Sequence, residues 1–243
     1  MRVLIAPDAF AGSLSAGQVA VAMARGWHEQ APGDALVTLA LSDGGAGFVD
    51  AVAAAADDSA EAGARDDELV PVTVSGPTGA DVPATVLLTT RDGVRTAYLE
   101  SAQVVGRHLA PGADPARTTS AGVAALLRAA VAAGATRVVV GCGPAATNDG
   151  GAGLLAALGA GDRGSAGERL LRGGGALHDL PDDALAGLAD VRAGLAGVEL
   201  VAATDDDLPL LGFHGLSATS APQLGASAEQ AQQLERALGR YSD

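Results

Sequence analysis

The sequence predicts an α/β protein in which a Rossmann-like parallel sheet domain carries an inserted second α/β domain. Apolar runs rich in Val, Leu and Ile alternate with helix-forming runs along much of the chain, as they do in βα units. Three of the apolar runs end in short loops that contain glycine and aspartate, which is typical of the turn between a strand and a helix. Between residues 70 and 99 the pattern changes to short β runs joined by turns, and this change predicts the insertion.

The individual elements follow from the same signals in chain order. Apolar runs predict the strands, and helix-forming runs predict the helices, the first with a cap at Ser13 or Ser15. An acidic stretch rich in Ala and Gly, 57–68, predicts a solvated connection. The expected strands are 3–6, 36–41, 70–75, 82–89, 95–99, 137–140 and 198–202, and the expected helices are 15–27, 47–56, 121–133 and 227–240.

A chain of 243 residues can form one large domain or two smaller ones, and the insertion favours two. The Rossmann-like α/β domain is expected to be discontinuous, comprising 1–68 and 107–172. The second domain is expected to comprise 69–106 and 173–243. This division places the predicted glycine-rich loops in the first domain and the polar C-terminal helix in the second.

The charge and the basic residues exclude two classes of function. The formal net charge is −14 at pH 7, and so acidic a surface repels phosphate backbones, so no nucleic acid partner is expected. All 15 basic residues are arginines, so the chain has no lysine for a Walker A loop or a Schiff base.

The cysteine count and the apolar runs indicate a cytoplasmic location. Cys142 is the only cysteine, so no intrachain disulfide can form, which fits a reducing compartment. Pro7 and Asp8 interrupt the first apolar run too early for a signal peptide, and Arg128 breaks the long Ala-rich run. We therefore expect no contact with a membrane.

The most informative segment is the glycine-rich loop 141–153, which follows one predicted strand and leads into helix-forming residues. Glycines let the backbone approach a bound group, and the N–H groups at a helix start attract anions. Asn148 and Asp149 add polar side chains at this point. The alternative is a tight turn that is capped by Asp149 and binds nothing.

Two further loops share this description, 8–15 after the first strand and 42–45 after the second. Because the carboxyl ends of parallel strands meet at one edge of a sheet, Asp8, Asp43 and Asp149 are expected to converge there. Carboxylates at such an edge can hold Mg²⁺ or take a proton from a hydroxyl group. Alternatively, each aspartate caps its own helix and faces water.

Several segments match one protein family in collinear order. Residues 6–16 resemble the opening of the type-1 glycerate kinase family, and Asp43-Gly44-Gly45 resembles its second loop. Residues 146–153, Ala-Thr-Asn-Asp-Gly-Gly-Ala-Gly, are similar to its signature. Further matches at Glu100, Gly106, 173–177 and 205–226 extend the resemblance to the last helix.

The resemblance implies phosphorylation of glycerate, with ATP and Mg²⁺ as cofactors, in a cleft between the two domains. It implies that Asp43 or Asp149 acts on the glycerate hydroxyl or holds Mg²⁺, and that Asp149→Ala abolishes ligand binding while leaving the fold intact. Glycerate and a nucleotide are therefore the expected small-molecule partners. The residues expected to contact substrate or phosphate are Asp8, Gly12, Ser13, Gly44, Gly45, Thr147, Asn148, Gly150, Gly151 and, from the second domain, Asp205.

The chain departs from the family pattern at several polar positions, which leads us to expect an impaired kinase. Alanine replaces a usual serine, lysine and glutamate at 9, 11 and 46, and leucine replaces an asparagine and a lysine at 208 and 224. Loss of one charge-assisted contact to a transferring phosphoryl group costs about 10²–10³ in rate.

Two alternatives to an active kinase remain open at this stage. One is a catalytically degenerate homologue that binds a small acid or a nucleotide or regulates a partner. The other is half of a split enzyme, because the sequence ends before the family's C-terminal part. Strands missing from the sheet would expose an edge and apolar surface, and we expect a homodimer contact, a second chain or a rearranged C-terminus to cover them.

Overall fold

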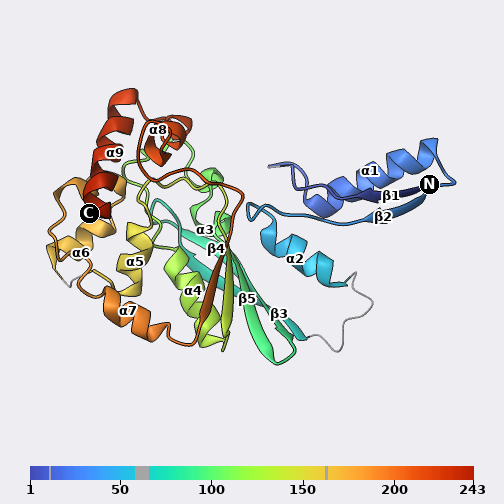
Figure 1. Ribbon diagram of the computed structural model, residues 1–243, viewed down its shortest axis with the longest axis horizontal. Coiled ribbons are helices and arrows are strands. Elements are labelled where there is room, and N and C mark those ends of the chain that lie inside the picture. Colours follow the sequence, from blue (N-terminus) through green and yellow to red (C-terminus); the bar gives the residue numbers. More distant parts are fainter. Residues whose placement is uncertain (11, 58–65, 162–163) are drawn as a thin grey trace.

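The fold of the protein is given by a computed structural model that describes residues 1–10, 12–57, 66–161 and 164–243 (Figure 1). It confirms an α/β fold. The main elements are β1 (Arg2–Ile5), α1 (Ala16–Gln30), β2 (Ala35–Thr38), α2 (Phe48–Asp57), β3 (Asp66–Ser75), β4 (Asp81–Arg91), β5 (Val94–Glu100), α3 (Ala102–Val105), α4 (Val123–Ala132), β6 (Arg137–Gly141), α5 (Ala152–Leu158), α6 (Ser165–Leu170), the 3₁₀ segment η2 (Gly174–Asp179), α7 (Leu188–Gly194), β7 (Glu199–Ala203), α8 (Leu216–Ser220) and α9 (Ala228–Ser242).

The strands are divided between two sheets. The larger sheet has the order β3-β4-β5-β6-β7, with antiparallel pairing among β3, β4 and β5 and parallel pairing among β5, β6 and β7. Among the described residues, the smaller sheet consists of β1 and β2, paired in parallel. With α1 it forms a lobe that projects sideways from the rest of the molecule (Figure 1).

This division corrects one expectation, because the strands that precede the three loops do not share a single parallel sheet. The short strands 70–75, 82–89 and 95–99 continue directly into the parallel part of the larger sheet through the β5–β6 pair. The proposed domain boundaries remain a prediction, and the larger sheet combines strands from both of the expected domains.

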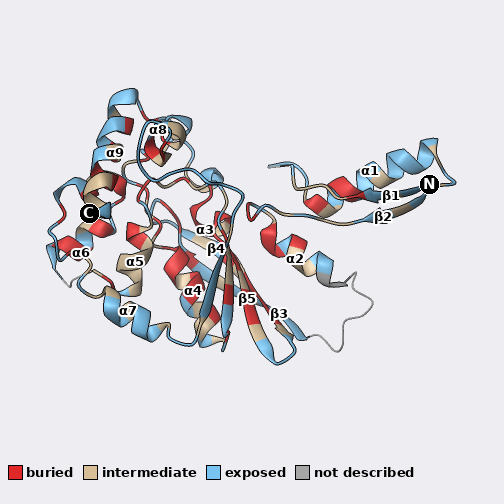
Figure 2. Cartoon of the chain, in the orientation of Figure 1, coloured by how far each residue is buried: buried red, intermediate tan, exposed pale blue. Residues whose placement is uncertain are grey.

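The principal core lies between the larger sheet and helices α3 and α4. Val86, Leu88 and Leu99 from the sheet are fully buried against Leu126 of α4 and Val104 of α3. A second cluster joins α5, α6, η2 and α9 and includes the buried Leu170, Leu177 and Leu238. Buried residues concentrate in these two regions, whereas β1 and β2 are largely exposed or intermediate (Figure 2).

The predicted helices and strands that precede or follow the glycine-rich loops are confirmed, with ends that differ by a few residues. The short helices α6, α7 and α8 were not predicted, because segments of five to seven residues that contain or adjoin glycine show no helical periodicity. The expected connection 57–68 lies mostly outside the described residues. Within the described part of the chain, none of the helices combines the length and apolar character needed to cross a membrane.

A pH-dependent contact holds the turn between α1 and β2. The Met1 ammonium donates to Asp34 Oδ1 at 2.7 Å and the Trp27 indole Nε1 to Asp34 Oδ2 at 3.1 Å. These two hydrogen bonds lower the pKa of Asp34 below its ordinary value of 3.8, against the smaller opposing effect of burial. A lowered pKa means that this stabilisation is complete above pH 3.8 and is lost as the pH falls through the folded-state pKa.

We therefore expect the fluorescence of Trp27, the only tryptophan of the chain, to change in a step below pH 3.8. The Asp34→Asn variant lacks the titrating carboxyl group and should not show this step. Far-UV circular dichroism, recorded in parallel, separates the local change from global acid unfolding. An identical step in the variant would show that Asp34 is not its cause.

Candidate functional site

The loop that follows β2 lies against the carboxyl ends of β6 and β7. A Cβ atom placed on Gly44 would lie 2.2 Å from the carbonyl oxygen of Ala203, at the end of β7. A Cβ atom on Gly143 would lie 2.5 Å from the Cα atom of Gly45. The backbones of the three segments are therefore in direct contact, although their strands belong to different sheets.

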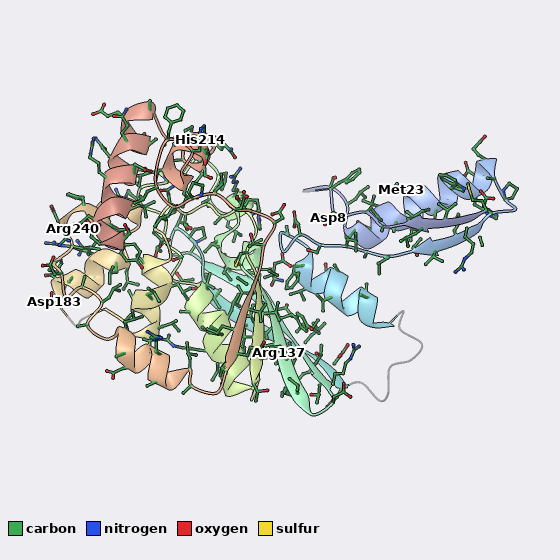
Figure 3. The ribbon with its side chains drawn as sticks, in the orientation of Figure 1. Asp8, Met23, Arg137, Asp183, His214 and Arg240 are labelled. Atoms are coloured by element: carbon green, nitrogen blue, oxygen red, sulfur yellow. The ribbon has the colours of Figure 1, made fainter. Side chains whose placement is uncertain are left out.

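The first loop also reaches this region. The amide of Leu41 donates to the carbonyl oxygen of Pro7 at 3.0 Å, and the Cβ atom of Ala9 lies 3.8 Å from the Cβ position of Gly47. The Asp8 side chain, which is half-buried, accepts a hydrogen bond from the Ala9 amide at 2.6 Å. Figure 3 shows Asp8 at the end of the N-terminal lobe that is nearer to α2.

Two of the predicted acidic residues are exposed at this edge of the larger sheet. Asp43 is exposed, and its Oδ1 atom accepts a hydrogen bond from the Gly45 amide at 2.7 Å. Asp205 is exposed two residues after the end of β7. Gly12 and Ser13 are exposed in the first loop, where the Ser13 hydroxyl donates to the Phe10 carbonyl. Ala11, between them and Phe10, lies outside the described residues.

Glu100 anchors the loop that carries Asp43. Its side chain is 5% exposed at the end of β5, and its two carboxylate oxygens accept hydrogen bonds from the amides of Gly47 (3.0 Å) and Val49 (3.2 Å). These amides lie at the start of α2, where a negative charge is favourable. No local pattern in the sequence indicates this role, since the two amides lie 51 and 53 residues away from Glu100.

We expect Glu100→Gln to lower the free energy of unfolding by about 1–2 kcal/mol, because a neutral amide replaces a buried carboxylate that accepts two backbone hydrogen bonds. The matched control is Glu68→Gln, which removes an exposed carboxylate paired with Arg95 and should cost at most about 1 kcal/mol. Urea unfolding followed by circular dichroism measures both. Equal losses in the two variants would contradict the anchoring role of Glu100.

Asp149 occupies a different environment from Asp43. It is 1% exposed, and its Oδ2 atom accepts hydrogen bonds from the Ser120 amide (2.8 Å), the Ser120 hydroxyl (2.9 Å) and the Gly153 amide (3.2 Å). Its Oδ1 atom accepts another from the Gly151 amide at 3.2 Å. Burial and, to a smaller extent, the charge of Asp149 raise the pKa of the nearby Tyr241. Asp149 therefore caps α5 and fastens it to the segment before α4.

The neighbouring residues of the signature are also tightly packed. Asn148 is fully buried and its Oδ1 atom accepts a hydrogen bond from the Ser217 hydroxyl at 2.9 Å, while its Nδ2 atom has no partner among the described residues. Its carbonyl oxygen lies 2.0 Å from the Cβ position of Gly174. The remaining predicted positions lie nearer the surface, with Thr147 and Gly151 half-buried and Gly150 exposed.

The predicted Asp and Asn side chains of the site lie in two groups. The loops of Asp8 and Asp43 lie together at the edge of the larger sheet, and Asp205 follows the neighbouring β7. Asn148 and Asp149 lie inside, under α8 and α9. Within the described ranges, no three His, Cys, Asp or Glu side chains are placed to hold a metal ion together.

The fold and these loops define an α/β protein with glycine-rich, acidic loops at the carboxyl ends of parallel strands, where open α/β sheets bind small ligands. The profile of the glycerate kinase family matches residues 3–243, nearly the whole chain. The chain belongs to this family.

Individual relatives are similar over the full length of the chain. It is 38% identical to a glycerate kinase of Bacillus subtilis (strain 168) and to a glycerate 2-kinase of Escherichia coli (strain K12), in each case over 245 aligned residues and 100% of this chain. A solved structure named as a glycerate kinase 2, from Salmonella typhimurium LT2, superposes on 99% of the chain with a TM-score of 0.73 and 36% identity. The chain spans 60% and 61% of the length of the first two relatives and 61% of the third.

Proposed function

We propose that this chain provides the glycerate-binding and phosphate-binding loops of an ATP-dependent glycerate kinase. The observation that carries this proposal is the contact of the Asp43 loop with the glycine-rich loop after β6 and with the end of β7. This contact puts the exposed Asp43 carboxylate beside several glycines at one edge of the sheet, which suits an anionic substrate and its reacting hydroxyl. Membership of the family, and relatives named for glycerate phosphorylation, support the substrate.

Asp43 is the residue proposed to orient or deprotonate the glycerate hydroxyl. Its carboxylate is exposed at the edge, whereas that of Asp149 is buried and accepts four hydrogen bonds from its own surroundings. We assign Asp149 a positioning role, in which it fixes the start of α5. Asp8 and Asp205, together with Gly12, Ser13, Gly44, Gly45 and the exposed part of the signature, are proposed to contact substrate or phosphate.

The residues at this edge fit a magnesium nucleotide better than a free metal ion. Mg²⁺ takes one or two protein carboxylates and completes its shell with water and phosphate oxygens, and Asp43 and Asp205 offer such carboxylates. When bound, Mg-ATP supplies the phosphoryl group and neutralises charge on it. The protein's own contribution is then to position glycerate and accept the hydroxyl proton.

A second candidate is a homologue that binds glycerate or a nucleotide without turnover. The observation that favours it is the loss of polar groups within the site itself. Ala46 is exposed directly after the Asp43-Gly44-Gly45 loop, and Leu208 is exposed in the segment after β7. The chain also contains no lysine, so no lysine ammonium group is available to contact a phosphate.

Glycerate-dependent formation of ADP from Mg-ATP tests the proposal. The protein should turn over above background, and Asp43→Asn should lower the rate by about 10²–10³. The control, Asp81→Asn, replaces an exposed aspartate at the start of β4 and should leave the rate unchanged. If no turnover is detected but calorimetry shows binding of glycerate or ADP, the second candidate would replace the proposal of a kinase.

A further inference from the structure

A cavity of about 480 Å³ lies between α2 and one face of the larger sheet. Thr89 of β4 pairs with Thr96 of β5, and Thr96 pairs with Arg137 of β6, so the three side chains point to the same face. Tyr98, two residues after Thr96, points to this face as well. The principal core with α3 and α4 lies on the opposite face, where the alternate residues of these strands are buried. The cavity is therefore separate from the core, and its volume lies within the range of small-molecule sites.

Helix α2 forms an apolar wall of this cavity. Val52 and Ala55 line it from the helix and, being three residues apart, lie on the same side of α2. At the start of α2 the ring of Phe48 packs against that of Tyr98, with the ring centroids 6.1 Å apart and an interplanar angle of 58°. Val94 contributes a further apolar side chain from the start of β5. These side chains suit the carbon part of a small molecule.

Two threonines form the polar floor of the cavity. Thr89 and Thr96 both line it, and they are only 6% and 7% exposed. Neither hydroxyl group forms a hydrogen bond to another described residue. A polar group in a largely buried position is unfavourable unless it is hydrogen-bonded, and a molecule with oxygen atoms in the cavity would supply the partner for both hydroxyls.

Two arginines flank the same cavity. Arg91 is exposed at the end of β4 and forms no ion pair or hydrogen bond with another described side chain. Arg137 begins β6, and its Nε atom donates to Glu199 at 2.7 Å, which leaves the two terminal nitrogens of its guanidinium group for other partners. Strand β5 separates β4 from β6, a distance of about 10 Å, so two long side chains can reach one ligand between them. Figure 3 shows Arg137 on the lower part of the larger sheet.

The charges and the position of the cavity define the kind of ligand. Among the described residues that line it, Arg91 and Arg137 are positive and Asp92 is negative, which gives a net positive lining in a chain of net charge −14. The Asp43 loop contacts Gly141, the last residue of β6, whereas the cavity lies at the first residue of this strand, about 13 Å away. The cavity therefore favours an anion and is distinct from the candidate site.

We propose that this cavity binds a small phosphate monoester. Arg91 and Arg137 hold the phosphate group from two sides, the hydroxyls of Thr89 and Thr96 donate to its oxygens, and the carbon part packs against α2. Two guanidinium groups and two hydroxyls match the three free oxygens and the double charge of a phosphate monoester better than the two oxygens of a carboxylate. The inference goes beyond the proposed function and does not depend on it.

Calorimetric titration with phenyl phosphate as the probe tests the inference without an assay of activity. We expect saturable 1:1 binding, and Arg91→Gln should weaken it by about tenfold or more, because a charge-assisted hydrogen bond is lost. The matched control is Arg192→Gln, which removes an exposed arginine of α7 that does not line the cavity and should leave the affinity unchanged.

Asp92→Asn is the variant with the opposite expected effect. It removes the negative charge from the lining and should tighten binding by about two- to fivefold. Asp92 has a φ of 52°, a conformation that asparagine also adopts, so the turn should keep its fold. Far-UV circular dichroism of all three variants checks that the fold is retained.

Amide chemical shifts locate the bound probe. Phenyl phosphate should shift the amide resonances of Thr89 and Thr96, and shifts confined to Gly44 and Gly45 would place the phosphate in the candidate site and overturn the inference. The inference is also overturned if phenyl phosphate does not bind, if Arg91→Gln binds it as tightly as the unmodified chain, or if Asp92→Asn does not bind it more tightly. Benzoate is the carboxylate probe, and binding of benzoate as tight as that of phenyl phosphate would contradict the assignment to a phosphate monoester.

Discussion

The Asp149→Ala variant is expected to lose at least about 3 kcal/mol of the free energy of unfolding. The substitution leaves four donors, three of them backbone amides, without their acceptor, and three of the four hydrogen bonds are buried. A buried donor left unsatisfied costs about 1–3 kcal/mol, and losses of this size are confined to a few such mechanisms. Urea unfolding followed by far-UV circular dichroism measures the change.

The matched control is Asp43→Ala, an aspartate at the corresponding place in the second loop. Asp43 is exposed and accepts one backbone hydrogen bond, from Gly45, so its removal should cost about 1 kcal/mol. A small loss for Asp149→Ala, comparable to that of Asp43→Ala, would mean that the buried network contributes little. The geometry thus revises the expectation that Asp149→Ala leaves the fold intact, because any loss of ligand binding would accompany a loss of stability.

The local elements could be predicted because their signals lie within a few residues of each other. The strand Arg137–Gly141 and the glycine-rich loop after it are evident from a β-branched run followed by glycines. The cap of α9 is similar, since Ser227 and Gln230 form a capping box that is visible in the sequence. The resemblance to the glycerate kinase family also predicts the order of the loops along the chain. Membership of this family is confirmed.

The division of the strands into two sheets could not be predicted, because it depends on pairing between distant segments. Nothing within the short run Ala35–Thr38 indicates that β2 pairs with β1 alone. The same holds for the environments of the acids. Glu100 accepts hydrogen bonds from amides 51 and 53 residues away, and Asp149 accepts them from Ser120, which is 29 residues away. Because Asp43 and Asp149 are both followed by glycines in similar loops, the local sequence does not distinguish their environments. Their chemical difference is a consequence of tertiary packing.

The contact between the loops of the candidate site predicts a large effect for Gly44→Ala. Gly44 has a φ of +94°, and an added Cβ atom would lie 2.2 Å from the carbonyl oxygen of Ala203. The left-handed conformation costs a non-glycine residue about 1–2 kcal/mol, and forcing extra atoms into packed structure typically costs 1–3 kcal/mol more. We therefore expect a loss of about 3 kcal/mol in the free energy of unfolding, together with loss of any glycerate-dependent activity.

Gly47→Ala separates the cost of the left-handed backbone from the cost of the steric contact. Gly47 lies in the same loop with a φ of +90°, but a Cβ atom added there would contact only the Ala9 side chain, at 3.8 Å. It should carry the backbone cost alone, about 1–2 kcal/mol. The difference between the two variants, measured by urea unfolding under the same conditions, then reports the contact with Ala203. Equal losses would indicate that the loop does not rest on the end of β7. Asp43 would then not be held at this edge of the sheet by the contact between Gly44 and Ala203.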